Sequence, residues 1–484
     1  MRKTLLADVL RSFSKEEMKR FIQFADSPYF NTSEATAKLL KEIGRFHPLI
    51  DGRGVSKEIL FEKVYGAKKY SDALMRKLIS NLLHLSEKFL TVENQQLAEC
   101  SLLAGLRTKK LYTQFSKKIE SLTTESDISI INEDVFLFSS LIESERSIYL
   151  YEIDRAREYD IAVLNSFKYD TLYYFYQLAR TYIRASHNLI YNPSGKESLI
   201  LGIVSSIDFE KLNQSIKTAD PVRKEVLLHL FDLIKMELTK DGSLFPGIKN
   251  FSFKYSEMHP GTTTYIGYIY MFEFISYQLK NGNRQYIFER HEIYRQLEKY
   301  SYSTNPGQMS LILFNNIFFS GIVTRDPVFS EYVLGKYILG IEAKGNPELN
   351  KFYRAWLLFQ NGKFADSLKL ITTFSTSGFM LDDHVITPSV KRLVLMLNFE
   401  LGYFDEALYS LDSVLHFMRN SKKLSETQKE SMILFTKVFR QLLLLKINNR
   451  KFSFRSARGS IGNEVSAGNN WLIEKLDGLE KSDD

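Results

Sequence analysis

The sequence predicts an all-α protein: a superhelix of helical hairpins that follows a small N-terminal helical domain. Three observations lead to this fold class. The 484 residues include only 10 prolines and 24 glycines, so turn formers are scarce, while aromatic residues make up 13% and supply large side chains for packing between helices. Segments of helix length alternate with short breaks such as NPSGK, KNGN and TRDP. Two stretches near the C-terminal end also repeat one pattern 40 residues apart.

The repeated stretches are LLFQNGKFADSLKLI (357–371) and LNFELGYFDEALYSL (397–411). Each has a phenylalanine three residues before a glycine, an aromatic residue two positions after it, and then a small residue and a leucine. Glycine permits the turn of a hairpin, the aromatic side chain fills the space between its two helices, and the small residue lets them approach. Because a single hairpin cannot bury its apolar stripe, each hairpin must stack on its neighbours.

The pattern G-x-[aromatic]-x-x-[small]-L, in NGKFADSL and LGYFDEAL, resembles the turn and second helix of tetratricopeptide repeats. The spacing is wider than that family's period of about 34 residues, the usual first-helix tryptophan is absent from its place, and no proline closes either unit. Fainter matches lie at 277–294 and 319–334. The layout also resembles a group of uncharacterised bacterial proteins in which a small helical unit precedes such repeats. The resemblance implies a TPR-like array.

We expect five regions along the chain. Ser14 and Glu17 have the spacing of a capping box, which predicts a helix start inside the first region. Small polar residues dominate RSARGSIGNEVSAGNN, as is typical of a linker, and the apolar residues after it predict a short helix that either caps the array or enters a groove of a partner. The regions are a small helical domain (1–92), long helices (93–191), the hairpin array (192–450), a flexible linker (451–470), and a C-terminal amphipathic helix and tail (471–484).

Residues 70–92 predict a long helix with one apolar and one basic side. The apolar positions are Leu74, Leu78, Leu82, Leu85 and Phe89. The other side has Arg76, Lys77, Asn81, His84 and Lys88. Arginine and asparagine can donate to base edges and lysine suits phosphates, so a nucleic-acid-binding regulator is the alternative function. Against it, residues 1–100 hold 17 basic and 13 acidic residues, which is a mild excess.

The sequence has no motif for catalysis, cofactor binding or metal binding. HEIYR (291–295) is half of a zinc-protease motif, with Arg295 in place of the second histidine. Asp382, Asp383 and His384 are adjacent in sequence, and adjacent side chains rarely point at one ion. We therefore expect neither a cofactor nor an enzyme activity. An enzyme whose site is assembled from distant side chains is the third hypothesis.

The tetratricopeptide resemblance implies that the first helices of the repeats turn a partner-binding face inward. These positions are Phe352, Trp356 and Phe359 in one unit and Arg392, Met396 and Phe399 in the next. Apolar residues with one arginine suit a peptide or helix that is anchored by hydrophobic side chains. Alternatively, the C-terminal helix or a neighbouring turn covers this face. The sequence thus predicts a non-catalytic scaffold or adaptor that binds a partner protein or peptide of unknown identity.

Composition indicates a soluble protein of a reducing compartment. Cys100 is the one cysteine, which excludes an intrachain disulfide, and the net charge of +7 is small beside 64 basic and 57 acidic residues. The most apolar stretch, YIGYIYMFEFISYQL (265–279), is too short to span a bilayer and contains Glu273, so we expect a buried helix. No apolar signal-peptide core follows the first basic residues. We expect a cytoplasmic location without membrane contact.

Overall fold

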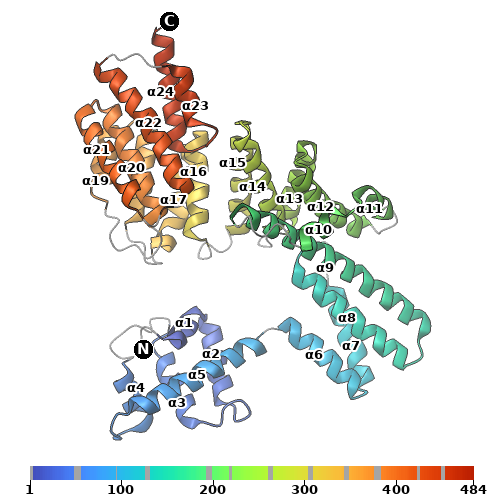
Figure 1. Cartoon of the computed structure of the whole chain (residues 1–484). Coiled ribbons are helices and arrows are strands. Elements are labelled where there is room, and N and C mark those ends of the chain that lie inside the picture. The colour runs from blue at the N-terminus through green and yellow to red at the C-terminus, as the bar shows by residue number, and fades with distance from the viewer. Residues whose placement is uncertain are drawn as a thin grey trace. The chain divides into compact units, whose positions relative to one another are not determined.

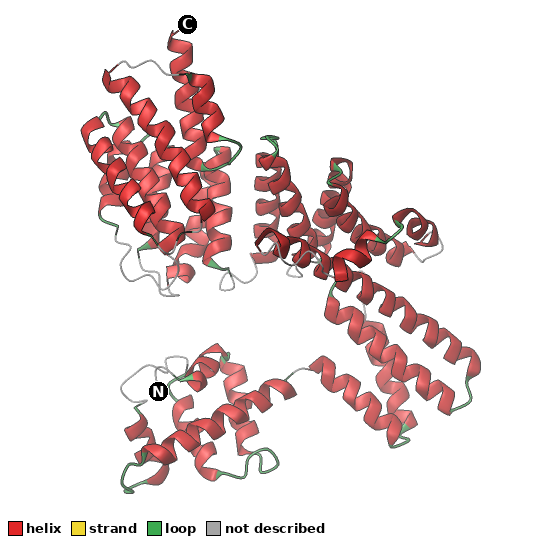
Figure 2. Cartoon of the chain, in the orientation of Figure 1, coloured by secondary structure: helices red, strands yellow, loops and turns green. Residues whose placement is uncertain are grey.

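All regular elements that the structure describes are helices. The structure is a computed structural model that describes residues 4–47, 56–93, 95–125, 131–191, 199–216, 221–259, 265–302, 309–342, 348–374, 383–421, 424, 426–448 and 453–483. Within these ranges no β-strand occurs, and helices that follow one another in sequence pack as adjacent pairs (Figure 2). The all-α helical-hairpin fold predicted from the sequence is confirmed.

The chain divides into two compact units, which we call the first unit (1–126 and 137–169) and the second unit (127–136 and 170–484). Two long helices, α8 (Glu133–Glu152) and α9 (Ala156–Tyr191), contribute residues to both. The other helices of the first unit are α1 (Leu5–Ser12), α2 (Lys15–Asp26), α3 (Glu34–Gly44), α4 (Lys57–Tyr65), α5 (Asp72–Val92), α6 (Gln95–Thr108) and α7 (Tyr112–Glu125) (Figure 1).

The second unit begins with α10 (Leu199–Ser205), α11 (Phe209–Ile216), α12 (Pro221–Thr239), the 3₁₀ turn η3 (Gly242–Leu244), α13 (Phe245–Met258), α14 (Tyr265–Lys280), α15 (Tyr286–Leu297) and the π turn η4 (Glu298–Tyr302). It continues with α16 (Leu311–Thr324), α17 (Pro327–Glu342), α18 (Leu349–Gln360), α19 (Phe364–Thr372), α20 (Asp383–Glu400), α21 (Phe404–Asn420), α22 (Glu426–Asn448), α23 (Phe454–Ile461) and α24 (Ala467–Asp483).

Helices α1 to α5 enclose a core of their own. The capping box is present as predicted, because the Glu17 amide donates to Ser14 Oγ over 3.1 Å and the Ser14 amide donates to the Glu17 carboxylate over 2.6 Å. Helix α5 buries Leu78, Leu82, Leu85 and Phe89 as expected. Leu74 was also expected on this side, but it is 45% exposed and Met75 lies in the core instead. Leu74 and Met75 are adjacent in sequence, and both lie near the apolar stripe of α5. Packing against the other helices of this core buries Met75 and leaves Leu74 at the edge.

The two repeated stretches adopt the same turn. Gly362 and Gly402 have positive φ angles of 72° and 75°, and the residue after each glycine donates to a carbonyl five positions earlier, over 2.9 Å at Lys363 and 2.8 Å at Tyr403. This is the helix-terminating motif in which glycine takes the left-handed conformation. The phenylalanine rings on either side of each turn also pair, at 5.4 Å for Phe359 with Phe364 and 6.0 Å for Phe399 with Phe404.

Two further hairpins end their first helix in the same way. Gly282, between α14 and α15, has φ 88°, and the Asn283 amide donates to the Gln278 carbonyl. Arg325, between α16 and α17, has φ 61°, and the Asp326 amide donates to the Gly321 carbonyl. These turns lie in the two stretches where the sequence showed only fainter matches, so four described hairpins of the second unit share one turn geometry.

The C-terminal part of the chain folds back onto the hairpins. Helix α24 packs against α16, α20, α22 and α23, and Trp471, Leu472 and Leu476 are buried there. The expected flexible linker, residues 451–470, includes helix α23 instead of irregular chain alone. Ser453 caps this helix, and Ala457 and Ile461 are buried at helical spacing, a short apolar pattern that the many small polar residues around it obscured.

Candidate functional site

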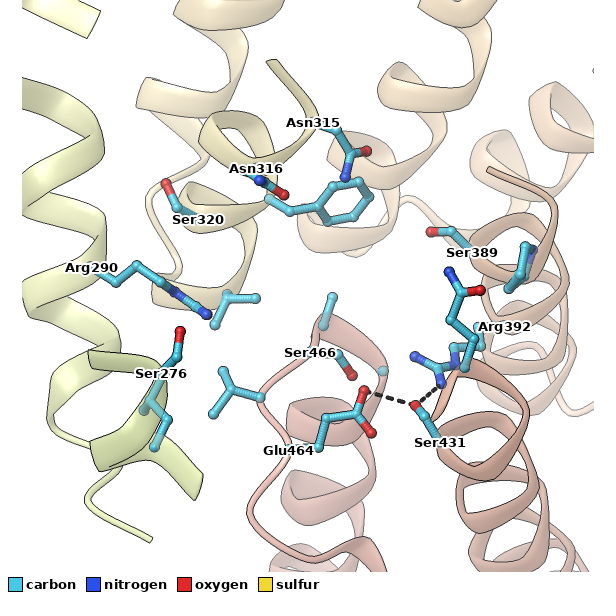
Figure 3. A pocket seen from close by; sticks show the side chains of 18 of the residues that line it. Ser276, Arg290, Asn315, Asn316, Ser320, Ser389, Arg392, Ser431, Glu464 and Ser466 are labelled. Carbon is cyan, nitrogen blue, oxygen red and sulfur yellow. Dashed lines mark hydrogen bonds between the residues drawn. The ribbon is translucent and has the colours of Figure 1, made fainter. Parts of the chain in front are cut away.

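A pocket of about 850 Å³ opens in the second unit (Figure 3). Its walls come from α14, α15, α16, α18, α20 and α22, from the segment that leads into α24 and from the first residues of α24. Apolar side chains such as Tyr294, Phe319, Val323, Trp356 and Leu434 lie beside serines, asparagines and charged groups. This mixture is typical of a site that anchors a ligand by apolar contact and orients it by a few polar groups.

The segment 463–468 forms one wall, and side chains on it and just after it bind to the hairpin helices. The Asn463 amide group donates to the Lys280 carbonyl over 2.8 Å, and the Asn470 amide group donates to the Val323 carbonyl over 3.3 Å. Gly468 allows the closest approach, since a Cβ atom there would lie 3.2 Å from the Phe435 ring and 3.4 Å from Arg392 Cδ. The C-terminal part of the chain is therefore built into the pocket.

Arg392 extends from α20 into the pocket and is held by neighbouring groups. Its guanidinium donates to Ser431 Oγ over 2.6 Å and lies 5.3 Å from the centre of the Phe435 ring. Ser431 in turn donates to the Glu464 carboxylate over 2.7 Å (Figure 3). Burial lowers the pKa of Arg392, and the charge of Glu464 opposes that shift. The Glu464 carboxylate thus offsets the positive charge of Arg392 through Ser431, which binds both side chains.

Arg290 approaches the pocket from α15, on the side opposite Arg392 (Figure 3). The side chain is half-buried, and burial lowers the pKa of its guanidinium. Within the described ranges it forms no ion pair and no side-chain hydrogen bond. Arg290 and Arg392 therefore differ: both are withdrawn from water, but only Arg392 has a carboxylate linked to it.

A chain of polar contacts leads from Ser320, on the pocket wall, to His291 and Asp326. Ser320 Oγ lies 2.9 Å from His291 Nδ1, and His291 Nε2 lies 3.2 Å from the Asp326 carboxylate. Burial lowers the pKa of His291, while Asp326 opposes the shift. These residue types also make hydrolytic triads, but Ser320 lies inside α16 and donates to the Ile317 carbonyl over 2.7 Å. The surrounding amides belong to the helix and offer no oxyanion hole, so the cluster joins α15, α16 and α17.

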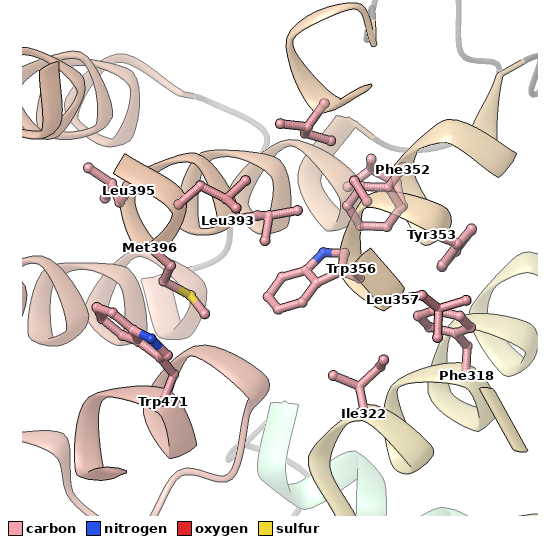
Figure 4. Close-up of a cluster of buried hydrophobic side chains, with 14 of the residues drawn as sticks. Phe318, Ile322, Phe352, Tyr353, Trp356, Leu357, Leu393, Leu395, Met396 and Trp471 are labelled. Carbon is pink, nitrogen blue, oxygen red and sulfur yellow. The ribbon is translucent and has the colours of Figure 1, made fainter. Parts of the chain in front are cut away.

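The residues predicted to bind a partner lie mainly in the core. Phe352, Trp356, Met396 and Phe399 are each at most 7% exposed, and α24 covers part of this face through Trp471, whose ring lies 5.4 Å from that of Phe399. Trp471 also donates to the Glu400 carboxylate over 2.6 Å. Figure 4 shows Trp356 and Met396 among the side chains of this cluster.

Three of these six residues line a pocket. Phe359 lines a smaller pocket of about 310 Å³ together with Trp471 and Gln360. Arg392 lines the larger pocket, where Trp356 also contributes to the wall. The structure thus leaves Arg392 as the predicted residue whose polar group faces a site.

The residues of α5 that were predicted to bind nucleic acid lie on the surface and do not line the pocket of about 850 Å³. Arg76, Lys77, Asn81, His84 and Lys88 are all exposed, as expected for a solvated face. Arg76 pairs with Asp72 over 2.7 Å, and His84 lies 3.4 Å from the Glu87 carboxylate. These acidic neighbours reduce the positive potential that phosphate binding requires.

Sequence reasoning missed Arg290, Asn316 and Glu464. A signal for Arg290 exists: Ile287, Tyr294 and Leu297 form an apolar stripe on α15, and Arg290 falls on this stripe at i+3 from Ile287. A charged residue at a core-facing position is unusual. Glu464 lies more than 70 residues from Arg392 in sequence, and no local pattern connects the two.

Comparisons of the chain with protein-family models, curated proteins and solved structures gave no match. In the described residues no group of three histidine, cysteine, aspartate or glutamate side chains is placed to hold a metal ion. Asp382 lies outside those residues, as do the side chains of Asp383 and His384. Among the described helices, none is both long enough and apolar enough to cross a bilayer. Helix α14, which covers the apolar stretch 265–279, buries Tyr268, Tyr270 and Phe274 in the core.

Proposed function

We propose that the chain is a non-catalytic scaffold or adaptor that binds a partner protein, and that the 850 Å³ pocket receives a peptide segment of that partner. The pocket is the observation that carries the proposal. Its volume suits a few side chains, and helices of several hairpins supply its walls. The resemblance of the hairpins to tetratricopeptide repeats, a class of peptide-binding arrays, supports the same reading.

Blocking the pocket with a bulky side chain tests the proposal. Asn316 is exposed on α16 and lines the pocket, so Asn316→Trp should fill the space without disturbing the core. Leu339→Trp is the matched control, because Leu339 is 76% exposed on α17 and lies outside the pocket. Immobilised wild-type and variant chains would be incubated with an extract of the native host, and bound proteins identified by mass spectrometry.

We expect at least one protein to be retained by the wild type and by Leu339→Trp and to be lost from Asn316→Trp. A partner that all three chains retain equally would refute the pocket as the binding site. Circular dichroism should give the same helical content for the three chains, which separates loss of binding from loss of fold.

Nucleic-acid binding through α5 is the alternative, and the observation that favours it is the exposure of all five side chains on one face. A mobility-shift assay at increasing salt separates it from the adaptor. Phosphate contacts give an affinity that falls steeply with salt, and the double replacement of Arg76 and Lys77 by alanine should weaken it further. Absence of a shift at low salt would eliminate this function.

A further inference from the structure

Arg290 carries a charge that the rest of the pocket does not neutralise. Arg392 shares the pocket, but Ser431 links it to Glu464 by hydrogen bonds of 2.6 and 2.7 Å. Arg290 has no corresponding carboxylate within the described ranges. Taking a guanidinium out of water without an anion is unfavourable, so the free pocket maintains a cation that a bound anion would stabilise.

The groups around Arg290 favour a peptide over a small inorganic anion. Phe319 and Tyr294 give the pocket apolar surface, and Leu434 is 39% exposed at its wall. Asn315 and Asn316 add amide groups that can bind a peptide backbone (Figure 3). A ligand that fills this space therefore needs an anionic group, an apolar group and backbone amides together.

We propose that the pocket recognises an acidic peptide segment, in which an aspartate or glutamate carboxylate pairs with Arg290 and a neighbouring apolar side chain contacts Phe319 and Leu434. Guanidinium and carboxylate form two parallel hydrogen bonds, which gives the pair orientation as well as affinity. The inference rests on the proposed function and specifies the chemistry of the partner.

A carboxylate suits the site better than a phosphate. The charged groups on the pocket wall are Lys280, Arg290, Arg392, Glu430 and Glu464. These three cations exceed the two carboxylates by one (3 − 2 = 1), so the wall carries a net charge of about +1, which matches one negative charge. A phosphate would bring nearly two negative charges near the two glutamates.

Selection from a phage-displayed library of unphosphorylated random dodecapeptides tests the inference on the full chain. Peptides would be selected on the wild type and then compared on Arg290→Met, on Asn316→Trp, and on Arg354→Met. Arg354 is exposed on α18 and does not line the pocket, so Arg354→Met makes the same charge change elsewhere. Methionine keeps the unbranched apolar stem of the arginine side chain and removes an uncompensated charge, so Arg290→Met should fold at least as well as the wild type.

We expect the selected peptides to be enriched in aspartate or glutamate next to an apolar residue. Their dissociation constant should rise about ten- to hundredfold on Arg290→Met, as for loss of a charge-assisted hydrogen bond, and stay unchanged on Arg354→Met. Replacing the acidic residue of the peptide with its amide should have the same effect, and Arg290→Lys should lie between. Affinity should also fall as salt increases.

Three outcomes would overturn the inference, and they are distinguishable. Peptides that bind the pocket and are lost with Asn316→Trp, but lack acidic residues and ignore Arg290→Met, would refute acidic recognition and leave the proposed function standing. A selected peptide that binds more than tenfold tighter when phosphoserine replaces its acidic residue would assign the site to phosphopeptides. Failure to select any peptide that Asn316→Trp blocks would reject both the inference and the pocket as the binding site.

Discussion

At the scale of single residues, the residue with positive φ in each hairpin turn determines how easily the repeat is recognised in the sequence. Of the four described turns in the array that share this geometry, three have glycine, at 282, 362 and 402, and the fourth has Arg325. Glycine adopts positive φ at little cost, whereas other residues lose roughly 1–2 kcal/mol there. The repeat was recognisable at Gly362 and Gly402, where glycine is followed by the same aromatic pattern, and faint at Arg325.

Replacing Gly402 with alanine should destabilise the second unit by about 1 kcal/mol, because the alanine must adopt φ near 75°. No atom lies within 4 Å of the added Cβ, so the effect is conformational and not a clash. Gly335→Ala is the control: Gly335 lies inside α17 in open space, and alanine there should stabilise the helix slightly. Urea unfolding followed by tryptophan fluorescence measures both, since Trp356 and Trp471 belong to the second unit. If the two substitutions changed the free energy of unfolding equally, the effect of Gly402→Ala could not be attributed to the positive φ angle of Gly402.

His229 is the most buried histidine among those of the second unit whose side chains the structure describes. It is 4% exposed, stacks on Phe251 with ring centres 4.2 Å apart, and neither of its ring nitrogens has a hydrogen-bond partner in the structure. Burial lowers the pKa of His229 to about 3. The folded chain therefore holds this ring neutral over a pH range in which the unfolded chain protonates it.

The consequence is a loss of stability in acid. A histidine in the unfolded chain binds a proton below about pH 6.5, whereas His229 in the folded chain stays neutral. The stability of the fold is therefore undiminished by His229 above that pH and decreases as the pH falls toward the folded pKa. Between pH 7.5 and 5.0 the loss should be about 2 kcal/mol from this residue. His229→Phe should remove that part of the loss, as measured by urea unfolding at both pH values. If the variant loses as much stability as the wild type, another group is responsible.

At the scale of helices, α24 completes the core of the hairpin array. Trp471 packs against Phe399 and Phe439 and donates to Glu400, which also binds Lys475 over 2.7 Å. Helix α24 thereby joins the end of α20 to α22. Its buried side chains belong to the same apolar cluster as Phe352 and Met396.

Trp471→Ala should destabilise the second unit by about 3–5 kcal/mol, the range for deleting a large buried aromatic side chain. The remaining Trp356 reports unfolding by fluorescence. Glu474→Ala on the same helix is the control, since Glu474 pairs with the exposed Arg325 and such surface pairs contribute at most about 1 kcal/mol. Similar losses in both variants would mean that α24 is not held by its buried face.

The sequence predicted the hairpins better than it predicted the site. Turn and pairing geometry depend on residues within one stretch, such as Phe359, Gly362 and Phe364, so a local pattern is sufficient to find them. The burial of Phe399 depends on α24, because the ring of Trp471 packs against it from some 70 residues further along the chain. The same reason hid the pocket, because Arg290 and Glu464 line one pocket only after the C-terminal segment has folded back.

At the scale of the whole molecule, the chain consists of two units whose apolar cores are distinct. The core of α1 to α5 draws its buried members from residues 6–89 alone. Phe13, Phe21 and Phe89 meet there with ring centres 5.1 to 5.6 Å apart, and Arg20 pairs with Glu93 over 2.6 Å. A core that is complete within one stretch of sequence is a property of a domain that folds alone. Unfolding of the full chain should accordingly not be a single two-state transition.

We expect a fragment of residues 1–93 to fold by itself. The fragment retains the whole core and the Arg20–Glu93 pair, so it should be helical and unfold cooperatively on heating, as measured by circular dichroism. A fragment of residues 1–66 is the control. It lacks α5, which contacts each of α1, α2, α3 and α4 and contributes Met75, Leu82 and Phe89 to the core. That shorter fragment should unfold without a cooperative transition, because four short helices then lose the element that holds them together. A gradual melt for residues 1–93 would show that this core requires the rest of the chain.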